Sequence, residues 1–433
     1  MSLFDIVAVM LTVAAVFGFL NTRYLKLEPS VGLLMISLAG SLGVMLLSWL
    51  VPGLEVVSVV RAYVANIDFN EALMHGMLGF LLFAGALHAD LDYFVQRRWT
   101  IVLLATFGLL LSTALVGAMS KAVFGMLGLE AGWLACLVFG ALISPTDPIA
   151  VMGTLKTLHA PPALEAKIAG ESLFNDGVAV VVFTVLVALL QQHAGHGGGH
   201  GHGGSLGPGG MALLFLRESG GGALLGLVSG WIAYRMMLAI DDYKVEVLIT
   251  LALVMGSYSL AWAWHISGPI AVVMSGLLIG NRGRSFAMSD EVADYLEKFW
   301  ELLDEILNAV LFLLIGVEIL VLPFTRSHVL AGAVSIAVVL LARLVSVAVP
   351  ITLMKMRTAF SQGVIRILTW SGLRGGISVA LVLSLPNIPE KPLLIICTYV
   401  VVLFSILVQG MTIKKVLRRY IDPPAAEGLA DQV

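Results

Sequence analysis

Long apolar runs recur along the whole of this 433-residue chain. A run of about 20 apolar residues can cross the hydrocarbon core of a bilayer as a helix. The composition is 59% hydrophobic and only 12% charged, and the mean hydropathy is +0.98. Soluble globular proteins do not have such a composition, so we expect an all-α polytopic membrane protein.

Polar or glycine- and proline-rich breaks separate the runs and define about thirteen candidate transmembrane helices. They lie approximately at 4–20, 31–51, 71–89, 100–124, 131–155, 168–190, 211–234, 245–264, 267–280, 300–322, 328–353, 362–385 and 392–413. In this arrangement most Lys and Arg residues outside the runs fall on one side of the membrane, including all those that follow the last run. Because basic residues mark the cytoplasmic side, we expect a cytoplasmic C-terminus and an N-terminus outside.

Two carboxylates occur inside the sixth run, in the stretch 170–177 (GESLFNDG). Hydrocarbon neither solvates a charged group nor hydrogen-bonds it, so charges inside transmembrane helices usually serve a function. On a helix, Glu171 and Asn175 lie one turn apart, and so do Ser172 and Asp176. Asp176 has no evident partner in the sequence, which suits a group that exchanges ions. We therefore expect Asp176 to face a cavity and to hold either a proton or a metal cation.

The fifth and twelfth runs each contain a weak point for a helix. In the fifth, Thr146 and Asp147 stand between two prolines in the stretch 144–148 (SPTDP). Proline lacks the helical hydrogen-bond donor and clashes with the preceding turn, so this stretch predicts an interrupted helix with free carbonyls. The twelfth run has its weak point at 372–376 (GLRGG). Interrupted helices that cross near the bilayer midplane are typical of transporter ion sites.

The two weak points also predict the domain organisation of a single membrane unit. The chain divides into a first half, a glycine- and histidine-rich loop and a second half, at 1–190, 191–210 and 211–433. One bridging helix places the halves in opposite orientations, as an inverted repeat with core helices at about 100–190 and 328–413. The histidines at 193–202 could bind a transition metal or sense pH, but we favour a flexible glycine linker.

Two arginines, Arg343 and Arg374, lie in the middle of the eleventh and twelfth runs, too far from the ends to reach water easily. Each needs a buried partner, and Glu171 is the acid without another evident role. We expect this pair to fix the sixth helix, and the sequence leaves open which arginine takes part. The remaining polar groups are interpreted as interfacial or structural: His88, Asp90, Asp304, Glu305, Asn308 and Glu318. Of these, Asp304, Glu305 and Asn308 begin the tenth run and could line a cytoplasmic funnel.

Together, the stretches 144–148, 170–177 and 372–378 (GLRGGIS) resemble the motifs of the NhaP-type sodium/proton antiporters. These belong to the cation:proton antiporter superfamily, beside the animal sodium/proton exchangers. The resemblance covers nearly the whole membrane region, and the motifs occur in family order at family spacing. It implies a homodimer in the plasma (inner) membrane, an NhaA-like antiporter fold of thirteen helices, and alternating access by a mobile core. One departure is Ser371, where relatives often have glycine.

The resemblance also implies roles for individual residues. Asp176 would be the carboxylate that exchanges the cation and the proton, with Asp147, Ser172 and the Thr146 backbone carbonyl beside it. Electrogenic relatives have Asp-Asp where this chain has Asn175-Asp176. The resemblance therefore favours electroneutral exchange of one sodium or lithium ion for one proton.

The same motifs imply a charge cluster beside the site. Glu171 would be a buried acid held by an arginine. Arg343 matches the arginine of the family's Ala-Arg segment, and Arg374 matches that of its Gly-Leu-Arg-Gly segment. The expected role of all three is structural.

Other classes of function fit the sequence less well. An ion channel would repeat one pore motif, and an intramembrane aspartyl protease would carry a Gly-x-Gly-Asp signature. Exchange of potassium instead of sodium stays open, because hard cations share oxygen ligands and cavity size decides between them. We expect a transporter and not an enzyme, with no cofactor, no nucleic-acid partner, and membrane lipid as its surroundings.

Overall fold

The structure is a computed structural model that describes residues 3–50, 72–89, 98–158, 160–193, 208–283, 288–320, 322, 325–355 and 363–420. Within these ranges the ordered elements are all helices, as the sequence predicts. The helices of the first half are α1 (Leu3–Leu20), α2 (Pro29–Leu50), α5 (Leu78–Leu87), α7 (Leu109–Met126), α8 (Trp133–Ile143), α9 (Ile149–Thr157) and α10 (Pro162–His193). Asp90 and most of the loop 191–210, with its clustered histidines, lie outside the described residues.

The second half is also helical. Its helices are α11 (Pro208–Met237), α12 (Tyr243–Ala263), α13 (Gly268–Leu278), α15 (Asp290–Glu318), α16 (Arg326–Met354), α17 (Val364–Trp370), α18 (Gly376–Leu383), α19 (Lys391–Phe404) and α20 (Gly410–Tyr420). Wider π-helical turns extend or join several helices: η1 (Asn21–Leu25), η2 (Ala72–Met77), η3 (Leu104–Gly108), η4 (Ile279–Gly283) and η5 (Ser405–Gln409).

Seven helices in the described part of the chain are long and apolar enough to cross a membrane. Their apolar segments are Asp5–Leu25, Pro29–Leu47, Arg98–Met126, Leu164–Gln192, Tyr243–Ala263, Arg326–Met354 and Lys391–Tyr420. The chain is therefore a multi-pass membrane protein. Helical residues occur in every candidate range of the sequence, but several of these helices are short, interrupted or more polar. The count of thirteen spans and the inverted repeat stay predictions.

Large apolar side chains cover much of the outer surface. In α1 only 11% of the apolar segment is buried, and Phe19 is 64% exposed. Leu46 of α2 and Trp231 of α11 are also exposed. A helix that is apolar on all sides suits a bilayer, because lipid solvates the face that protein does not cover.

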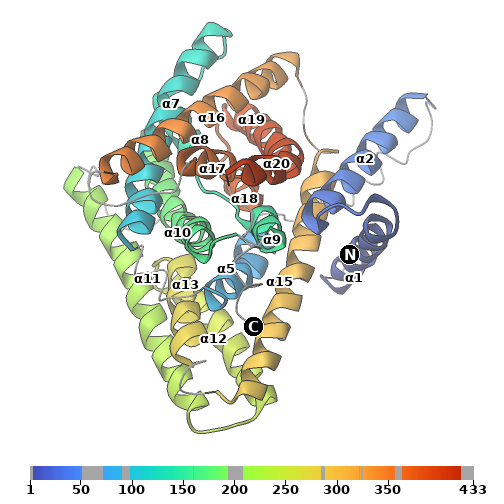
Figure 1. The fold of residues 1–433 in the computed structure, drawn as a ribbon. Helices are drawn as coiled ribbons and strands as arrows, with labels where there is room; N and C mark the ends of the chain where they lie inside the picture. Colours follow the sequence, from blue (N-terminus) through green and yellow to red (C-terminus); the bar gives the residue numbers. More distant parts are fainter. Residues whose placement is uncertain are drawn as a thin grey trace, which may run out of the picture.

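The interrupted helices lie between two flanking groups of helices (Figure 1). On one side, α15 packs against α1 and α2, and on the other side α11 packs against α12 and α13. Between them, α10 contacts α8, α9 and α18. The functional motifs of the sequence therefore meet in the middle of the protein.

Both predicted interruptions are confirmed by the structure. Helix α8 ends at Ile143 and α9 begins at Ile149, while α17 ends at Trp370 and α18 begins at Gly376. The two extended breaks meet in an antiparallel bridge, in which the backbone N–H of Asp147 donates to the carbonyl of Leu373 at 2.8 Å. Each break thus satisfies backbone groups of the other.

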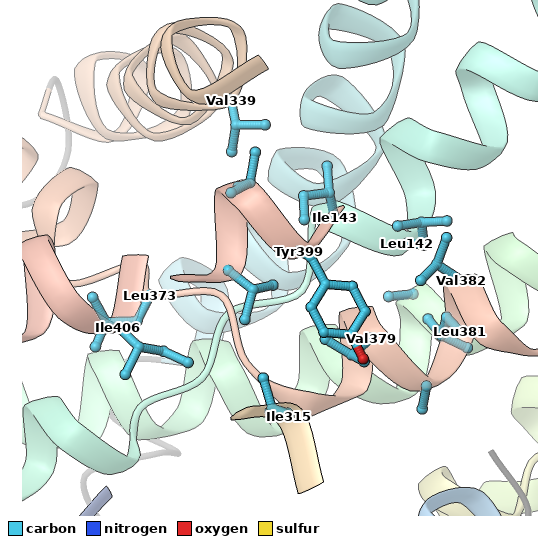
Figure 2. Packing of buried hydrophobic residues seen from close by; sticks show 14 of the residues in the cluster. Leu142, Ile143, Ile315, Val339, Leu373, Val379, Leu381, Val382, Tyr399 and Ile406 are labelled. Atoms are coloured by element: carbon cyan, nitrogen blue, oxygen red, sulfur yellow. The ribbon is translucent and has the colours of Figure 1, made fainter. Parts of the chain in front are cut away.

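A hydrophobic cluster holds the crossing together. Figure 2 shows Tyr399 of α19 between Ile143 of α8 and Val379 of α18, in a cluster that also contains Leu373 and Ile315. Each of these side chains is at most 2% exposed. Relative to exposure to water, burial of each such side chain stabilises a structure by roughly 1.5–3 kcal/mol. The crossing is therefore a packed element and not an open loop.

Candidate functional site

Helix α10 carries four polar residues of the site in its middle. Glu171, Ser172, Asn175 and Asp176 are each at most 6% exposed. The helix runs from Pro162, a residue well suited to a first helical turn, through an apolar sequence to His193. The polar residues therefore lie within a continuous, rigid element.

A hydrogen-bonded network connects α10 to the break between α8 and α9. The hydroxyl oxygens of Thr146 and Ser172 are 2.9 Å apart. The amide of Asn175 donates to the Thr146 hydroxyl at 2.9 Å, and its oxygen accepts from the Thr146 backbone N–H at 3.3 Å. Three side chains thus fix the extended backbone immediately before Asp147.

Asp147 lies between the N-termini of two half-helices. One oxygen of its carboxylate accepts the backbone N–H of Ile149 at 2.9 Å, at the start of α9. Its other oxygen lies against Gly375, where any Cβ atom would overlap the carboxylate. Gly375 directly precedes α18. Because helix N-termini carry partial positive charge, this position suits a carboxylate.

Asp147 and Asp176 lie close enough to interact electrostatically. Among the residues that the structure describes, neither forms an ion pair. Both line one large cavity, together with Thr146. These residues therefore present oxygen atoms and negative charge to a common space, which is the donor set that a hard cation requires.

The two buried arginines have different partners. Arg343 of α16 forms an ion pair with Glu171 and also donates to the carbonyl of Leu368, with its Nη2 at 3.0 Å. Gly372 allows this approach, since a Cβ atom there would overlap the Arg343 guanidinium. Of the two arginines that the sequence left open, Arg343 is therefore the partner of Glu171.

Arg374 instead holds the break between α8 and α9. Its Nη1 donates to the carbonyls of Ser144 and Pro145, the latter at 2.8 Å. Its own backbone N–H donates to the Ser405 hydroxyl at 2.8 Å. Because the helix is interrupted here, these two carbonyls lack helical N–H partners, and the guanidinium of Arg374 donates to them instead.

The cavity has a volume of about 1370 Å³ and is lined by residues of the crossing together with residues of α2, α5, α9, α10 and α15. Among the residues that the structure describes, eight carboxylates, three lysines and one histidine line it: Glu28, Asp147, Glu165, Asp176, Glu297, Glu301, Asp304, Glu305, Lys26, Lys156, Lys414 and His88. The excess of carboxylates makes the cavity attractive to cations.

The structure brings together most of the residues singled out in the sequence, but in two layers. Thr146, Asp147 and Asp176 line the cavity, whereas Ser172 and Asn175 lie behind Thr146 and line none of it. The charge cluster of Glu171, Arg343 and Arg374 also lies outside the cavity.

Sequence reasoning missed part of the cavity wall. It did not single out Glu28, Glu165, Glu297 or Glu301, all of which line the cavity. Glu297 and Glu301 stand four residues apart on α15, a spacing that places both on one helix face and could have indicated them. Glu28 lies in a connection, where no periodic signal exists.

Comparison with known proteins identifies the family of the chain. Residues 9–419 match the family described as sodium/hydrogen exchanger, transmembrane. The chain is 48% identical to the Na⁺/H⁺ antiporter NhaP of Pseudomonas aeruginosa over 420 residues, which cover 96% of each protein. It is 32% identical to the Na⁺/H⁺ antiporter NhaH of Halobacillus aidingensis, again over 96% of each chain.

The fold also resembles that of a solved structure, the sodium proton antiporter MjNhaP1 from Methanocaldococcus jannaschii at pH 8. The TM-score is 0.74 with 19% sequence identity, and the match covers 98% of this chain and 100% of the other. The NhaP-type resemblance of the sequence motifs is thus confirmed over the whole membrane region. This chain belongs to the transmembrane sodium/hydrogen exchanger family.

Proposed function

We propose that the protein exchanges sodium ions for protons across the membrane, with Asp176 as the shared site. The observation that carries this proposal is the position of Asp176 and Asp147, side by side in an acidic cavity without ion-pair partners in the described structure. A carboxylate that is not neutralised by an arginine can bind a proton or a cation in turn. The relatives named as Na⁺/H⁺ antiporters support the choice of cargo.

The direct ligands of the cation are Asp176, Asp147 and the oxygens of Thr146. Ser172 and Asn175 act through Thr146, because their hydrogen bonds hold its hydroxyl and its backbone. Glu171 and Arg343 neutralise one another and fix α10 against α16. Because neither Glu171 nor Arg343 then takes part in the exchange, Asp176 binds only protons and sodium.

The exchange is electroneutral in this proposal. Asn175 occupies the position next to Asp176 and carries an amide, which does not titrate in water. Only one carboxylate then changes its protonation state in each cycle, so one proton crosses for each sodium or lithium ion. In this proposal Asp147 is a ligand that does not exchange its proton, and its carboxylate accepts the backbone N–H of Ile149 at the start of α9.

The proposed exchange proceeds by alternating access, and the lysines of the cavity lining indicate which side is open. The lysines that line it, Lys26, Lys156 and Lys414, all belong to the basic side of the membrane in the sequence arrangement. The positive-inside rule therefore assigns the open side to the cytoplasm, with the N-terminus outside, in a plasma (inner) membrane. The helices of the two core ranges, at about 100–190 and 328–413, form the mobile core, and we propose a homodimer in which the remaining helices stay fixed.

Transport in proteoliposomes tests the proposal. An inward sodium gradient should drive protons outward, as reported by a pH-sensitive dye inside the vesicles, and an equal potassium gradient should not. Proton movement with potassium alone would instead favour the potassium/proton exchanger that the sequence leaves open. A steady sodium flux without proton movement would favour a cation channel.

A further inference from the structure

One face of α15 follows the cavity from its mouth to the crossing. The residues on this face are Glu297, Glu301, Asp304, Asn308 and Leu311, spaced by four, three, four and three positions. This spacing keeps all five on one side of a helix. The face carries three carboxylates, then an amide, then an apolar residue.

Asn308 is the unusual member of this face. Its side chain is only 4% exposed, and it lines the cavity. It shares a hydrogen bond with Asp304, one turn earlier on the helix. Its carbonyl oxygen Oδ1 is buried and has no hydrogen-bond partner in the part of the chain that the structure describes. An unsatisfied buried oxygen is costly, so this atom indicates a ligand that supplies positive charge or a proton donor.

The position of this pair relates it to the central site. Asp304 is close enough to Asp147 for the two carboxylates to interact electrostatically. Leu311, at the inner end of the face, packs where a Cβ atom of Gly376 would stand, at the start of α18. The face of α15 therefore ends at the crossing, one residue from the contact between Gly375 and Asp147.

We propose that the Asp304 carboxylate and the Asn308 carbonyl oxygen form a second binding site for a monovalent alkali cation. One carboxylate and one amide oxygen, completed by water, match the oxygen preference of a hard cation of low charge. A cation here also offsets the repulsion between Asp304 and Asp147, which would otherwise oppose ionisation of both. The site loads cations from the cavity before they reach Asp176, and this role rests on the proposed exchange function.

The sequence assigned Asp304 and Asn308 to interfacial or structural roles. A specific binding site must also be distinguished from a cavity whose acidic residues only attract cations in general. Glu305 supplies the control, because it also lines the cavity on the same helix, one residue from Asp304. Glu305 is exposed, whereas Asn308 is buried beside Asp304. If the acidic residues only attract cations in general, loss of the Asp304 charge and loss of the Glu305 charge should weaken sodium binding equally. If Asp304 is a ligand, loss of its charge should weaken sodium binding much more.

The direct test measures equilibrium binding of radioactive sodium to the purified full-length protein carrying Asp147→Asn and Asp176→Asn. Saturable sodium binding should persist in this background at alkaline pH. Adding Asp304→Asn or Asn308→Leu should weaken it by at least about tenfold, the effect of losing about 1.4 kcal/mol of binding energy. Adding Glu305→Gln should change it by less than about twofold. Absence of saturable binding in the folded double variant, or equal losses with Asp304→Asn and Glu305→Gln, would overturn the second site.

A transport measurement covers the case in which the double variant does not fold. In the otherwise unchanged protein, Asp304→Asn should raise the KM for sodium several-fold with little change in the maximal rate, and Glu305→Gln should leave both constants unchanged. An unaltered KM in Asp304→Asn would contradict the loading site. Failure of the exchange function itself has a different signature, since the unsubstituted protein would then move no protons in a sodium gradient.

Discussion

Glu171 of α10 and Arg343 of α16 form an ion pair at which both side chains are almost completely buried, at 2% and 8% exposure. The pair joins the helix that carries Asp176 to a helix from the other half of the chain. It also removes an arginine that would otherwise compete with sodium for the carboxylates of the site. In the proposed exchange, this pair leaves Asp176 without an arginine partner and therefore available to protons and sodium.

Glu171→Gln should destabilise the protein strongly, because it leaves the Arg343 guanidinium buried without a counter-charge. Removing one partner of a buried ion pair costs about 3–5 kcal/mol. A double-mutant cycle on thermal stability should show strong coupling of Glu171 with Arg343 and little with Arg374, which donates to carbonyls. Asp294→Asn is a matched control, because its pair with Lys298 is exposed and should contribute less than about 1 kcal/mol. Equal melting temperatures for Glu171→Gln and this control would refute the structural role.

Gly375→Ala should impair transport, because the added methyl group would overlap the Asp147 carboxylate. Overpacking of this kind costs about 1–3 kcal/mol, and here the cost falls on the position of a cation ligand. We expect initial rates of sodium-driven proton flux in proteoliposomes to fall by about tenfold or more. Gly153→Ala is the control, since Gly153 also lines the cavity but has open space at its Cβ position. The account of the crossing fails if the two alanine variants transport equally fast.

Acid should raise the apparent KM for sodium and leave the maximal rate almost unchanged. A sodium ion binds only the ionised form of Asp176, so protons and sodium compete for one site. Saturating sodium overcomes this competition, which is why the maximal rate is preserved. Where the protonated form dominates, each unit of falling pH should raise the KM by about tenfold. Initial rates over a matrix of pH and sodium concentration would show this. A falling maximal rate at constant KM would instead indicate a proton that binds at a separate site.

Exchange should not respond to the membrane potential, because one proton replaces one monovalent cation at Asp176. Proteoliposomes with potassium and valinomycin allow the potential to be set while sodium-driven proton flux is followed. Rates should agree within about twofold across 100 mV, although one uncompensated charge would be worth about 2.3 kcal/mol over that range. A several-fold dependence, or a sustained current on solid-supported membranes, would require a second titrating group such as Asp147.

The sequence predicted those features that depend on local chemistry. Two prolines around Thr146 and Asp147 predicted the break after α8, and carboxylates in an apolar run predicted the polar centre of α10. The residues alone did not decide between Arg343 and Arg374, because both stand in mid-helix and their partners come from distant segments, and only the family resemblance favoured Arg343. Tertiary packing alone decides such pairs.

The two layers of the site were also beyond sequence reasoning. Ser172 and Asp176 are one turn apart on α10, yet only Asp176 lines the cavity, while the Ser172 hydroxyl lies 2.9 Å from that of Thr146. Of the carboxylates of α15, Asp304 and Glu305 were interpreted as interfacial or structural groups that could line a funnel, and Glu297 and Glu301 were not singled out. The helical spacing places these carboxylates on one face, but the neighbours of that face depend on how α15 packs against α2 and α18.

The most direct measurement is sodium-driven proton flux through Asp176→Asn protein in proteoliposomes, compared with the unsubstituted protein at equal protein density. The asparagine keeps the size of the side chain and removes its negative charge and its exchangeable proton. The account predicts a folded protein, with an unchanged elution volume in size-exclusion chromatography, whose sodium-dependent flux falls to the level of empty vesicles. Flux at the rate of the unsubstituted protein would show that another group carries the exchange and would contradict the role of Asp176.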